Sequence, residues 1–308
     1  MTVRHLDFLD LPFLMRYRQA ILSLDSARLL TRGNPLGATA LLSYLNPRRN
    51  LFTAIVSEEG HTLMGQFLLV DDSTSARLTF LAPEDEINGL TLPLLDHLAQ
   101  QAGEWGAQHI LAEVDEDSPA FKVLRQAGFS MYAWQRVWKL PVLTGRARME
   151  DWQDVDGQDW IAVQCLHSQI VPALLQPVEN LPRHPTGLVC FDGHELQACT
   201  FYASGPKGVW LKPLVMPDSF CFPGQVHSLV HAVDPWGNRP VYVCVRSYQA
   251  WLESSLEELG AEAGRRQAVM VKRLTLPVKE LQAVPAMEKA LAKVKPASPA
   301  ARLKKDEG

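Results

Sequence analysis

The stretch Ala112–Leu140, AEVDEDSPAFKVLRQAGFSMYAWQRVWKL, decides the fold of this chain. Its first residues end an apolar, strand-like run, and Asp117 or Ser118 can then cap a helix. Gly128 is placed to end that helix, because glycine adopts the left-handed conformation without strain. The remaining residues, 130–140, are hairpin-like. The stretch therefore predicts a strand, a helix and a closing pair of strands.

The residues before this stretch predict a mixed sheet with helices. After Asp10, which can cap a helix, Tyr17, Ile21 and Leu24 recur at helical spacing. We expect helices over 10–24 and 38–44, strands over 51–57, 63–70 and 76–82, a helix that begins near Asn88, and a strand over 109–114. The three central strands favour an antiparallel meander. The next helix is long enough to let the strands on either side of it run parallel.

The second half of the chain repeats the first. Val241–Val245, Gly260 and Val271–Leu274 stand 131, 132 and 134 residues after the matching strand, glycine and final strand. Three anchors in the same order indicate a duplication. Before these anchors we expect a helix over 161–175, strands over 187–191, 195–203 and 208–212, and a helix over 225–233.

These patterns predict an α/β fold class with two tandem domains, each a mixed central sheet flanked by helices. The expected units are 1–144, 145–278 and a basic, disordered tail over 279–308. With 308 residues, each half is long enough to bury a core of its own.

Composition narrows the function classes. The hydrophobic fraction is 47%, and 30 Lys and Arg face 34 Asp and Glu, which gives a net charge of -4. This balance argues against a nucleic-acid or anionic-membrane partner. Asp7 and Asp10 interrupt the first ten residues, so we expect no secretory signal peptide there, and no apolar run approaches the roughly 18 residues of a membrane span. The five cysteines form no CxxC pair, so we expect reduced thiols in a cytoplasmic protein.

The quoted stretch resembles the second half of an acyl-CoA N-acyltransferase of the GNAT superfamily. In that family a strand leads into a helix of pattern N-x-x-A-x-x-x-Y-x-x-x-G-F. Asp117 stands at the Asn position, Ala120 at the Ala, Leu124 at the Tyr, and Gly128-Phe129 at the Gly-Phe pair. The order of elements over 1–140 also matches that fold. The second half is similar but more divergent, with Leu256 at the Tyr position.

The resemblance implies acetyl-CoA as co-substrate. In the family, acetyl-CoA lies between the fourth and fifth strands, which separate from each other, and its pyrophosphate sits at the N-terminus of the next helix. Carried over to this sequence, backbone groups near Leu81 and Ala82 would hold the acyl-pantetheine arm. Asn88, Gly89 and Leu90 would hold the phosphates.

The phosphate loop departs from the family pattern. The usual loop is [Q/R]-x-x-G-x-[G/A], whereas this chain has Glu86 at the first position and keeps only Gly89. Glu84 and Asp85 add further negative charge, which disfavours a pyrophosphate. Acidic residues before a helix are also favourable N-terminal residues for structural reasons alone. The corresponding segment of the second half, 217–225, has no basic residue.

The family's catalytic tyrosine is missing from both halves, so other candidates must supply acid and base. Glu113, beside the end of the fifth strand, is the candidate base; alternatively it is a solvated residue at a strand end. Tyr132 or Tyr248 could supply a phenol, or could simply be packing aromatics. His227 and His231 lie four residues apart on an expected helix, but no third ligand is evident, so we predict no metal site.

Two functions remain open. The first is an acetyl-CoA-dependent N-acetyltransferase that transfers an acyl group to a small-molecule or peptide amine, with the better-preserved site in residues 1–140. The second is a catalytically inactive GNAT-like module for binding or assembly, favoured by the missing tyrosines and the acidic loop. A third possibility is that only the first half is GNAT-like. The acceptor and the oligomeric state are not encoded in any motif.

Overall fold

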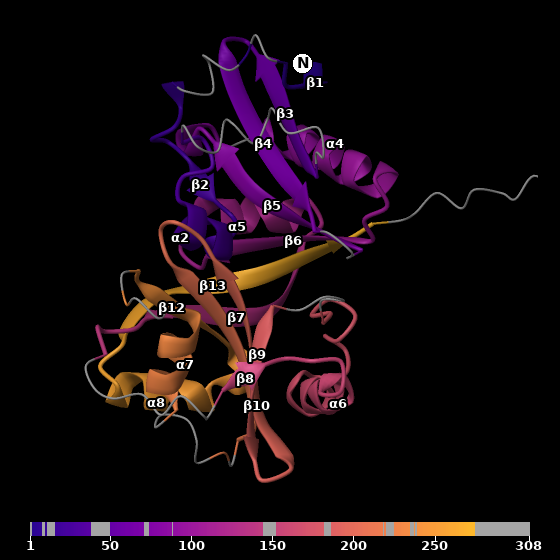
Figure 1. Cartoon of the computed structure of the whole chain (residues 1–308). Helices are drawn as coiled ribbons and strands as arrows, with labels where there is room; N and C mark the ends of the chain where they lie inside the picture. Colours follow the sequence, from indigo (N-terminus) through magenta and orange to yellow (C-terminus); the bar gives the residue numbers. More distant parts are fainter. Residues whose placement is uncertain are drawn as a thin grey trace, which may run out of the picture. The chain divides into compact units, whose positions relative to one another are not determined.

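One mixed sheet of thirteen strands runs through the described part of the chain, in the order β1-β3-β4-β5-β6-β13-β7-β12-β11-β10-β9-β8, with β2 paired to β5 (Figure 1). The strands of the first half are β1 (Thr2–His5), β2 (Leu22–Ser23), β3 (Leu51–Glu58), β4 (His61–Leu69), β5 (Ser75–Ala82), β6 (His109–Asp115) and β7 (Ser130–Lys139). Those of the second half are β8 (Gln153–Asp154), β9 (Gly187–Asp192), β10 (Glu195–Ser204), β11 (Val209–Val215), β12 (Val241–Arg246) and β13 (Glu262–Arg273).

The structure is a computed structural model that describes residues 2–7, 10, 16–37, 50–70, 74–87, 89–143, 152–181, 186–217, 219, 225–234, 237 and 239–274. Its helices are α2 (Ser26–Arg32), α4 (Thr91–Glu104), α5 (Pro119–Gln126), α6 (Trp160–Ile170), α7 (Val226–Val233) and α8 (Trp251–Glu258), with 3-10 turns η3 (Glu84–Glu86) and η4 (Ser247–Gln249). The predicted helix over 38–44, the boundary near 145 and the tail over 279–308 lie outside these residues. None of the helices in the described ranges is long and apolar enough to cross a membrane.

Each half repeats one topology. β3, β4 and β5 form the predicted antiparallel meander, and β5 then pairs in parallel with β6 after the crossover helix α4. In the second half β9, β10 and β11 are antiparallel, and β11 pairs in parallel with β12 after α7. The second half therefore contains the strand-helix-strand crossover. The possibility that it is unrelated to the first half is wrong.

The last strands of the two halves are exchanged. β7 ends the first half but pairs with β12 of the second, while β13 ends the second half and pairs with β6 of the first. β7 and β13 also pair with each other. The predicted hairpin over 130–140 is wrong, because these residues form one long strand with partners from the other half on both edges. Gly264 allows the close approach, since a Cβ there would lie 2.7 Å from the Val137 carbonyl oxygen.

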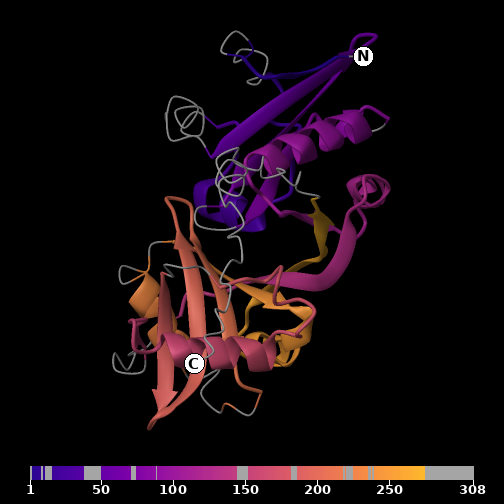
Figure 2. The same cartoon turned by 90° about the vertical axis from the view of Figure 1, so that its right-hand side faces the viewer.

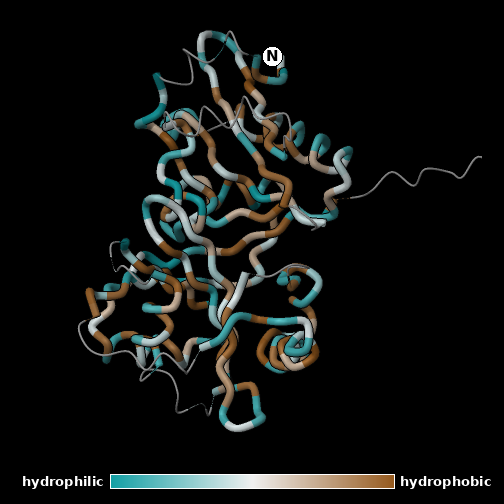
Figure 3. Tube along the Cα trace, in the orientation of Figure 1, coloured by the Kyte–Doolittle hydropathy of each residue, from teal (hydrophilic) through white to brown (hydrophobic). Residues whose placement is uncertain are grey.

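Helices cover both faces of the sheet in the second half, whereas α4 and α5 pack on the same face in the first half (Figures 1 and 2). Leu94, Leu95, Leu98 and Ala102 pack α4 into the core of the first half, together with Leu124 of α5, whereas Trp105 just after α4 is 37% exposed. The second half packs α7 and α8 on one face and α6 on the other. Figure 3 shows hydrophobic residues following the central strands, as this burial requires.

Helix α2 links the first half to the second. Asp25 caps it by accepting a hydrogen bond from the Arg28 backbone N–H at 3.1 Å. At its other end the Thr31 carbonyl accepts from the Lys207 N–H at 2.9 Å, in the turn between β10 and β11. A Cβ at Gly205 would lie 2.3 Å from the same carbonyl oxygen, so this contact needs a glycine.

Candidate functional site

The parallel strands of each half separate partway along their length. β5 and β6 are in register only over Ser75–Arg77 and His109–Leu111. β11 and β12 are in register only over Val209–Leu211 and Val241–Val243. Beyond these residues each pair leaves a slot between two strands. The separation of strands four and five that the GNAT resemblance implies is therefore present in both halves.

The slot of the first half is filled by the chain's own backbone. β2 pairs antiparallel with β5, with Leu22 opposite Leu81. Leu24 then bridges the slot, because its N–H donates to the Thr79 carbonyl at 3.0 Å and its carbonyl accepts from the Glu113 N–H at 2.9 Å. The predicted helix over 10–24 is wrong at this end, since pairing with β5 satisfies the backbone groups of these residues in an extended conformation.

The residues predicted to hold acetyl-CoA surround this filled slot. Leu81 and Ala82 are fully buried at the end of β5, and Leu81 already has Leu22 opposite it. Leu90 packs into the first core, Gly89 faces open space, and Asn88 lies outside the described residues. A pantetheine arm could not pair with β5 here while β2 holds its place. This part of the first half does not fit the family's ligand.

The acidic loop after β5 forms the 3-10 turn η3. Its last residue, Glu86, contacts His61 of β4 at 2.8 Å through Oε2 and the ring Nδ1. That hydrogen bond raises the pKa of His61. The glutamate at the family's basic position thus has a partner within the protein.

The slot of the second half is closed differently. The Gln249 amide reaches across from η4 to the free edge of β11. Its Nε2 donates to the Pro213 carbonyl at 3.0 Å, and its Oε1 accepts from the Val215 N–H at 3.1 Å. A single side chain therefore satisfies the strand edge that a segment of backbone occupies in the first half.

A buried carboxylate lies beside this second slot. Glu179 is 3% exposed, and its Oε1 accepts from the Tyr132 hydroxyl at 3.0 Å and pairs with Arg246 Nε at 3.0 Å. Its Oε2 accepts from Lys212 Nζ. Burial by itself would raise the pKa of Glu179, but Arg246 and Lys212 lower it well below its usual range.

Glu113, the base candidate, is also buried, with 4% of its side chain exposed. Its Oε2 accepts from the Ser26 N–H at 3.0 Å, and its Oε1 pairs with Arg77 at 3.5 Å. The alternative that Glu113 is a solvated strand-end residue is wrong. Burial raises its pKa, but Arg246 and Arg77 outweigh burial and lower it overall. Burial raises the pKa of nearby Asp25, despite Arg77.

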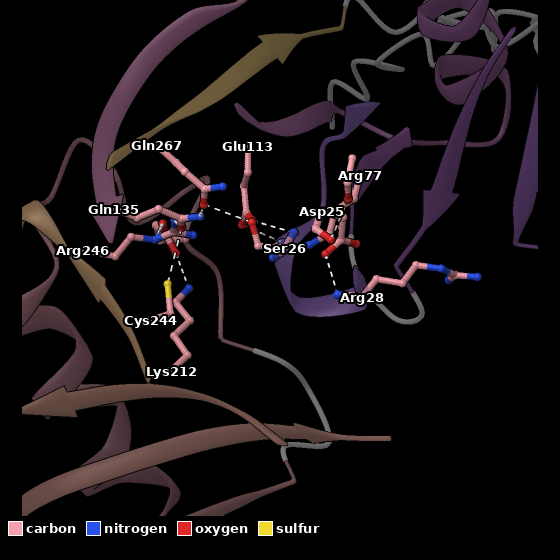
Figure 4. A network of polar contacts seen from close by, with 12 residues as sticks. Asp25, Ser26, Arg28, Arg77, Glu113, Gln135, Lys212, Cys244, Arg246 and Gln267 are labelled. Carbon is pink, nitrogen blue, oxygen red and sulfur yellow. Dashed lines mark hydrogen bonds and ion pairs between the residues drawn. The ribbon is translucent and has the colours of Figure 1, made fainter. Parts of the chain in front are cut away.

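The exchanged strands connect Glu113 to Arg246, the partner of Glu179 (Figure 4). Gln135 of β7 accepts from Arg246 and donates to Gln267 of β13 at 2.8 Å. Gln267 Oε1 also accepts from the Ser26 hydroxyl at 3.0 Å. A continuous polar network thus runs from Glu179 to Glu113. Cys244 joins it through Gln135, and burial raises the pKa of this thiol to about 11, so it is a poor nucleophile.

A pocket of about 440 Å³ opens beside the network and the second slot. It contains both tyrosines that the sequence suggested as proton donors, Tyr132 and Tyr248. The Tyr248 hydroxyl is buried. The pocket is lined by Val70, Thr74, Ser75, Arg77, Leu111, Tyr132, His167, Val171, Val178, Glu179, Asn180, Leu181, Phe201, Lys212, Leu214 and Tyr248.

His167 adds an imidazole to this pocket that the sequence had not singled out. Its Nε2 lies 2.7 Å from the Glu179 carbonyl oxygen. Because a carbonyl only accepts, Nε2 carries the proton and Nδ1 is an acceptor in the neutral ring. Burial lowers the pKa of His167, which favours that neutral form near pH 7. Among the described residues, no group of three His, Cys, Asp or Glu could hold a metal ion.

Comparison with known proteins supports the fold. No family model matches the sequence, and no curated protein matches it. A GCN5-related N-acetyltransferase from Sphaerobacter thermophilus matches with a TM-score of 0.50 and 14% identity, covering 88% of this chain and 95% of that one. The chain has the fold of the GNAT acetyltransferases.

A solved structure with two such units in one chain is also similar. It is a tandem GNAT protein from the clavulanic acid biosynthesis pathway, with a TM-score of 0.50 and 13% identity. The match covers 88% of this chain and 98% of that chain. The likeness therefore extends over both halves.

Proposed function

We propose that this chain is a cytoplasmic acyltransferase of two tandem domains, 1–144 and 145–278, in which acyl-CoA enters the slot of the second domain. The donor would be an acyl-CoA such as acetyl-CoA, and the acceptor a small amine. The observation that carries the proposal is the separation of β11 from β12 beyond Leu211 and Val243, beside a pocket that contains Tyr248.

The way each slot is closed favours the second half. An acyl-pantetheine arm entering the first slot must displace Leu22–Leu24, which is hydrogen-bonded to strands on both sides. In the second slot, the group that the described residues show hydrogen-bonded to the edge of β11 is the Gln249 amide. A net hydrogen bond contributes about 1 kcal/mol, so the binding energy of a ligand can offset the loss of the two hydrogen bonds of Gln249. We assign Leu81, Ala82, Asn88, Gly89 and Leu90 to the scaffold of the first half.

Two pocket residues have the chemistry that amide formation requires. Acyl-CoA supplies the activated acyl group. His167 Nδ1 would accept the proton that the attacking amine loses, and the Tyr248 hydroxyl would protonate the leaving sulfur. Burial raises the pKa of Tyr248, which keeps the phenol protonated as a donor must be. Glu113 does not line the pocket, and we give it the role of positioning Arg77 in place of that of a base.

Thiol release from acetyl-CoA in the presence of a panel of small amines tests this function. Wild-type protein should release CoA with at least one amine. Tyr248→Phe should lower kcat by about 100-fold, the usual contribution of a positioned acid. Tyr202→Phe, on β10 outside the pocket, is the matched control and should retain full activity. Absence of release with every amine, or full activity in Tyr248→Phe, would remove the proposal.

A second candidate is a binding module without catalysis. It is favoured by Gln249, which closes the second slot, and by the acidic turn Glu84–Glu86 of the first half. Such a protein would bind a ligand in the pocket but release no thiol. The same assay, combined with a measurement of ligand binding, separates the two functions.

A further inference from the structure

Two cationic side chains that line the pocket are partly exposed. Arg77 of β5 has 30% of its side chain exposed and Lys212 of β11 has 27%, and both line the pocket. Glu179 lines the same pocket but is only 3% exposed. One cation comes from each half of the chain, so the binding surface depends on both.

The carboxylates of the network are already engaged by the protein. Glu179 has Tyr132 and Arg246 on one oxygen and Lys212 on the other. Glu113 accepts from the Ser26 N–H and does not line the pocket. A cationic ligand would therefore meet no exposed carboxylate of this network in the pocket. An anionic ligand would meet two cationic side chains in a partly desolvated site, where charge-assisted hydrogen bonds are strong.

The rest of the lining defines the body of the ligand. Apolar side chains surround the pocket away from the two cations: Leu111, Val171, Val178, Leu181, Phe201 and Leu214. Pockets of about 300 to 1,000 Å³ accept small molecules, and 440 Å³ lies at the small end of that range. The lining suits a compact molecule with one anionic end and an apolar body.

We propose that this pocket binds a small apolar carboxylate of the amino-acid class, with its carboxylate on Arg77 and Lys212 and its apolar side chain against Phe201 and Leu214. The requirement for an amino group rests on the proposed function, because that group would accept the acyl group. Capture of the carboxylate requires only the pocket.

Calorimetric titration without acetyl-CoA tests the proposal. The probes are L-phenylalanine, 3-phenylpropanoate and L-phenylalaninamide, which separate the carboxylate from the amine on one apolar body. The two carboxylates should bind with a stoichiometry of one, and the amide should bind at least about tenfold more weakly, the loss expected when a charged partner is removed.

Variants locate the site. Arg77→Gln and Lys212→Gln should each weaken binding of 3-phenylpropanoate by about tenfold or more, whereas Lys139→Gln, a half-exposed lysine outside the pocket, should bind as wild type does. Arg77→Lys keeps the charge and should recover part of the affinity. Thermal melting confirms that each variant is folded, and the Arg77→Lys variant carries the test if Arg77→Gln does not fold.

Binding of the amide as tight as that of the acids would overturn the proposal, and so would wild-type affinity in both Gln variants or no binding of either acid at millimolar concentration. The same experiments distinguish failure of the carboxylate pocket from failure of the acyltransferase function. If the acids bind but no amine leads to thiol release, the carboxylate pocket stands without it. If phenylalaninamide is acetylated as well as phenylalanine, the acyltransferase stands and the carboxylate pocket fails.

Discussion

The two halves share a topology but close the same slot by different means. In the first half, β2 pairs with β5, and Leu24, which follows it, is hydrogen-bonded to both β5 and β6. In the second, one amide side chain spans the edge of β11. A hydrogen-bonded strand leaves only with the segment that carries it, whereas a side chain can rotate. The comparison teaches that a duplicated scaffold can lose or retain a ligand slot through what fills it, without any change of strand order.

The two halves also differ in how deeply the arginine partner of each buried carboxylate lies. Glu113 pairs with Arg77, which is 30% exposed, while Glu179 pairs with Arg246, which is 4% exposed. The second half therefore holds the more deeply desolvated ion pair, next to the pocket. Such a pair is sensitive to the loss of one partner, because the other is left charged and buried.

Separating the halves should have the largest effect. Because β13 completes the sheet of the first half and β7 that of the second, residues 1–143 expressed alone should lack β13, the antiparallel partner of β6. We expect no cooperative unfolding transition for this fragment, and recovery of one when residues 152–274 are added. Circular dichroism during thermal melting measures both. A fragment that melts cooperatively as a monomer would show that the exchange of strands is dispensable.

Removal of the Glu179 carboxylate should have the second-largest effect. Glu179→Ala leaves Arg246 buried without its counter-ion and should lower the free energy of unfolding by about 3 to 5 kcal/mol. Denaturant titration gives this value. Glu262→Gln removes one member of an exposed pair with Lys139 and should cost less than about 1 kcal/mol. Equal losses in the two variants would refute the difference in burial on which the comparison rests.

Leu24, which closes the first slot, and Gln249, which closes the second, should contribute differently to the free energy of unfolding. Leu24→Ala removes a fully buried side chain from the first core and should cost about 3 kcal/mol. Gln249→Ala removes two hydrogen bonds to β11 and should cost about 1 to 2 kcal/mol. Chemical denaturation of both variants checks the order. A larger loss for Gln249→Ala would mean that the second slot is the more firmly closed.

The smallest expected effect is the gradual loss of stability at low pH that the protonation of Glu179 causes. The pKa of Glu179 is lowered from 4.5, so the folded protein binds this proton less readily than the unfolded chain. Its contribution to stability is present above pH 4.5 and is lost as the pH falls toward the lower folded value. The wild type should lose up to about 1.4 kcal/mol per pH unit from this group.

Glu179→Gln removes this titration, so unfolding curves between pH 5 and pH 3 should fall less steeply for the variant, as about one proton fewer is taken up on unfolding. Glu262→Gln, with 77% of the replaced side chain exposed, serves as the control. Parallel curves for wild type and Glu179→Gln would show that Glu179 is not held in its charged form by the fold.

Periodicity predicted most of the fold. The strands over 51–57, 63–70 and 76–82, the helix expected after Asn88 and the repeat of Gly128 by Gly260 are confirmed. The exchange of β7 and β13 could not be predicted, because the alternation of a strand shows which face is buried but not which strand is its neighbour. β2 was missed because two residues are too few for any period, and Ile21 and Leu24 happened to continue a helical one.

The site was predicted only in part. Tyr132 and Tyr248 were candidates because phenols are the family's acids, and the pocket contains both. Glu179, Lys212 and Arg246 gave no signal, because they are far apart in the sequence and belong to no motif. A buried ion pair is a property of the folded chain. The acids of the loop after β5 form the turn η3, where Glu86 contacts His61, a contact that no motif in the sequence indicated.

The central claim, that the second slot and not the first receives acyl-CoA, is tested most directly by titrating acetyl-CoA into wild type, Gly89→Glu and Gln249→Ala in a calorimeter. Gly89 faces open space, so its substitution leaves the fold intact. We predict one site in the wild type, unchanged affinity in Gly89→Glu, and about tenfold tighter binding in Gln249→Ala, since no amide must be displaced. Loss of binding in Gly89→Glu together with unchanged binding in Gln249→Ala would contradict the account.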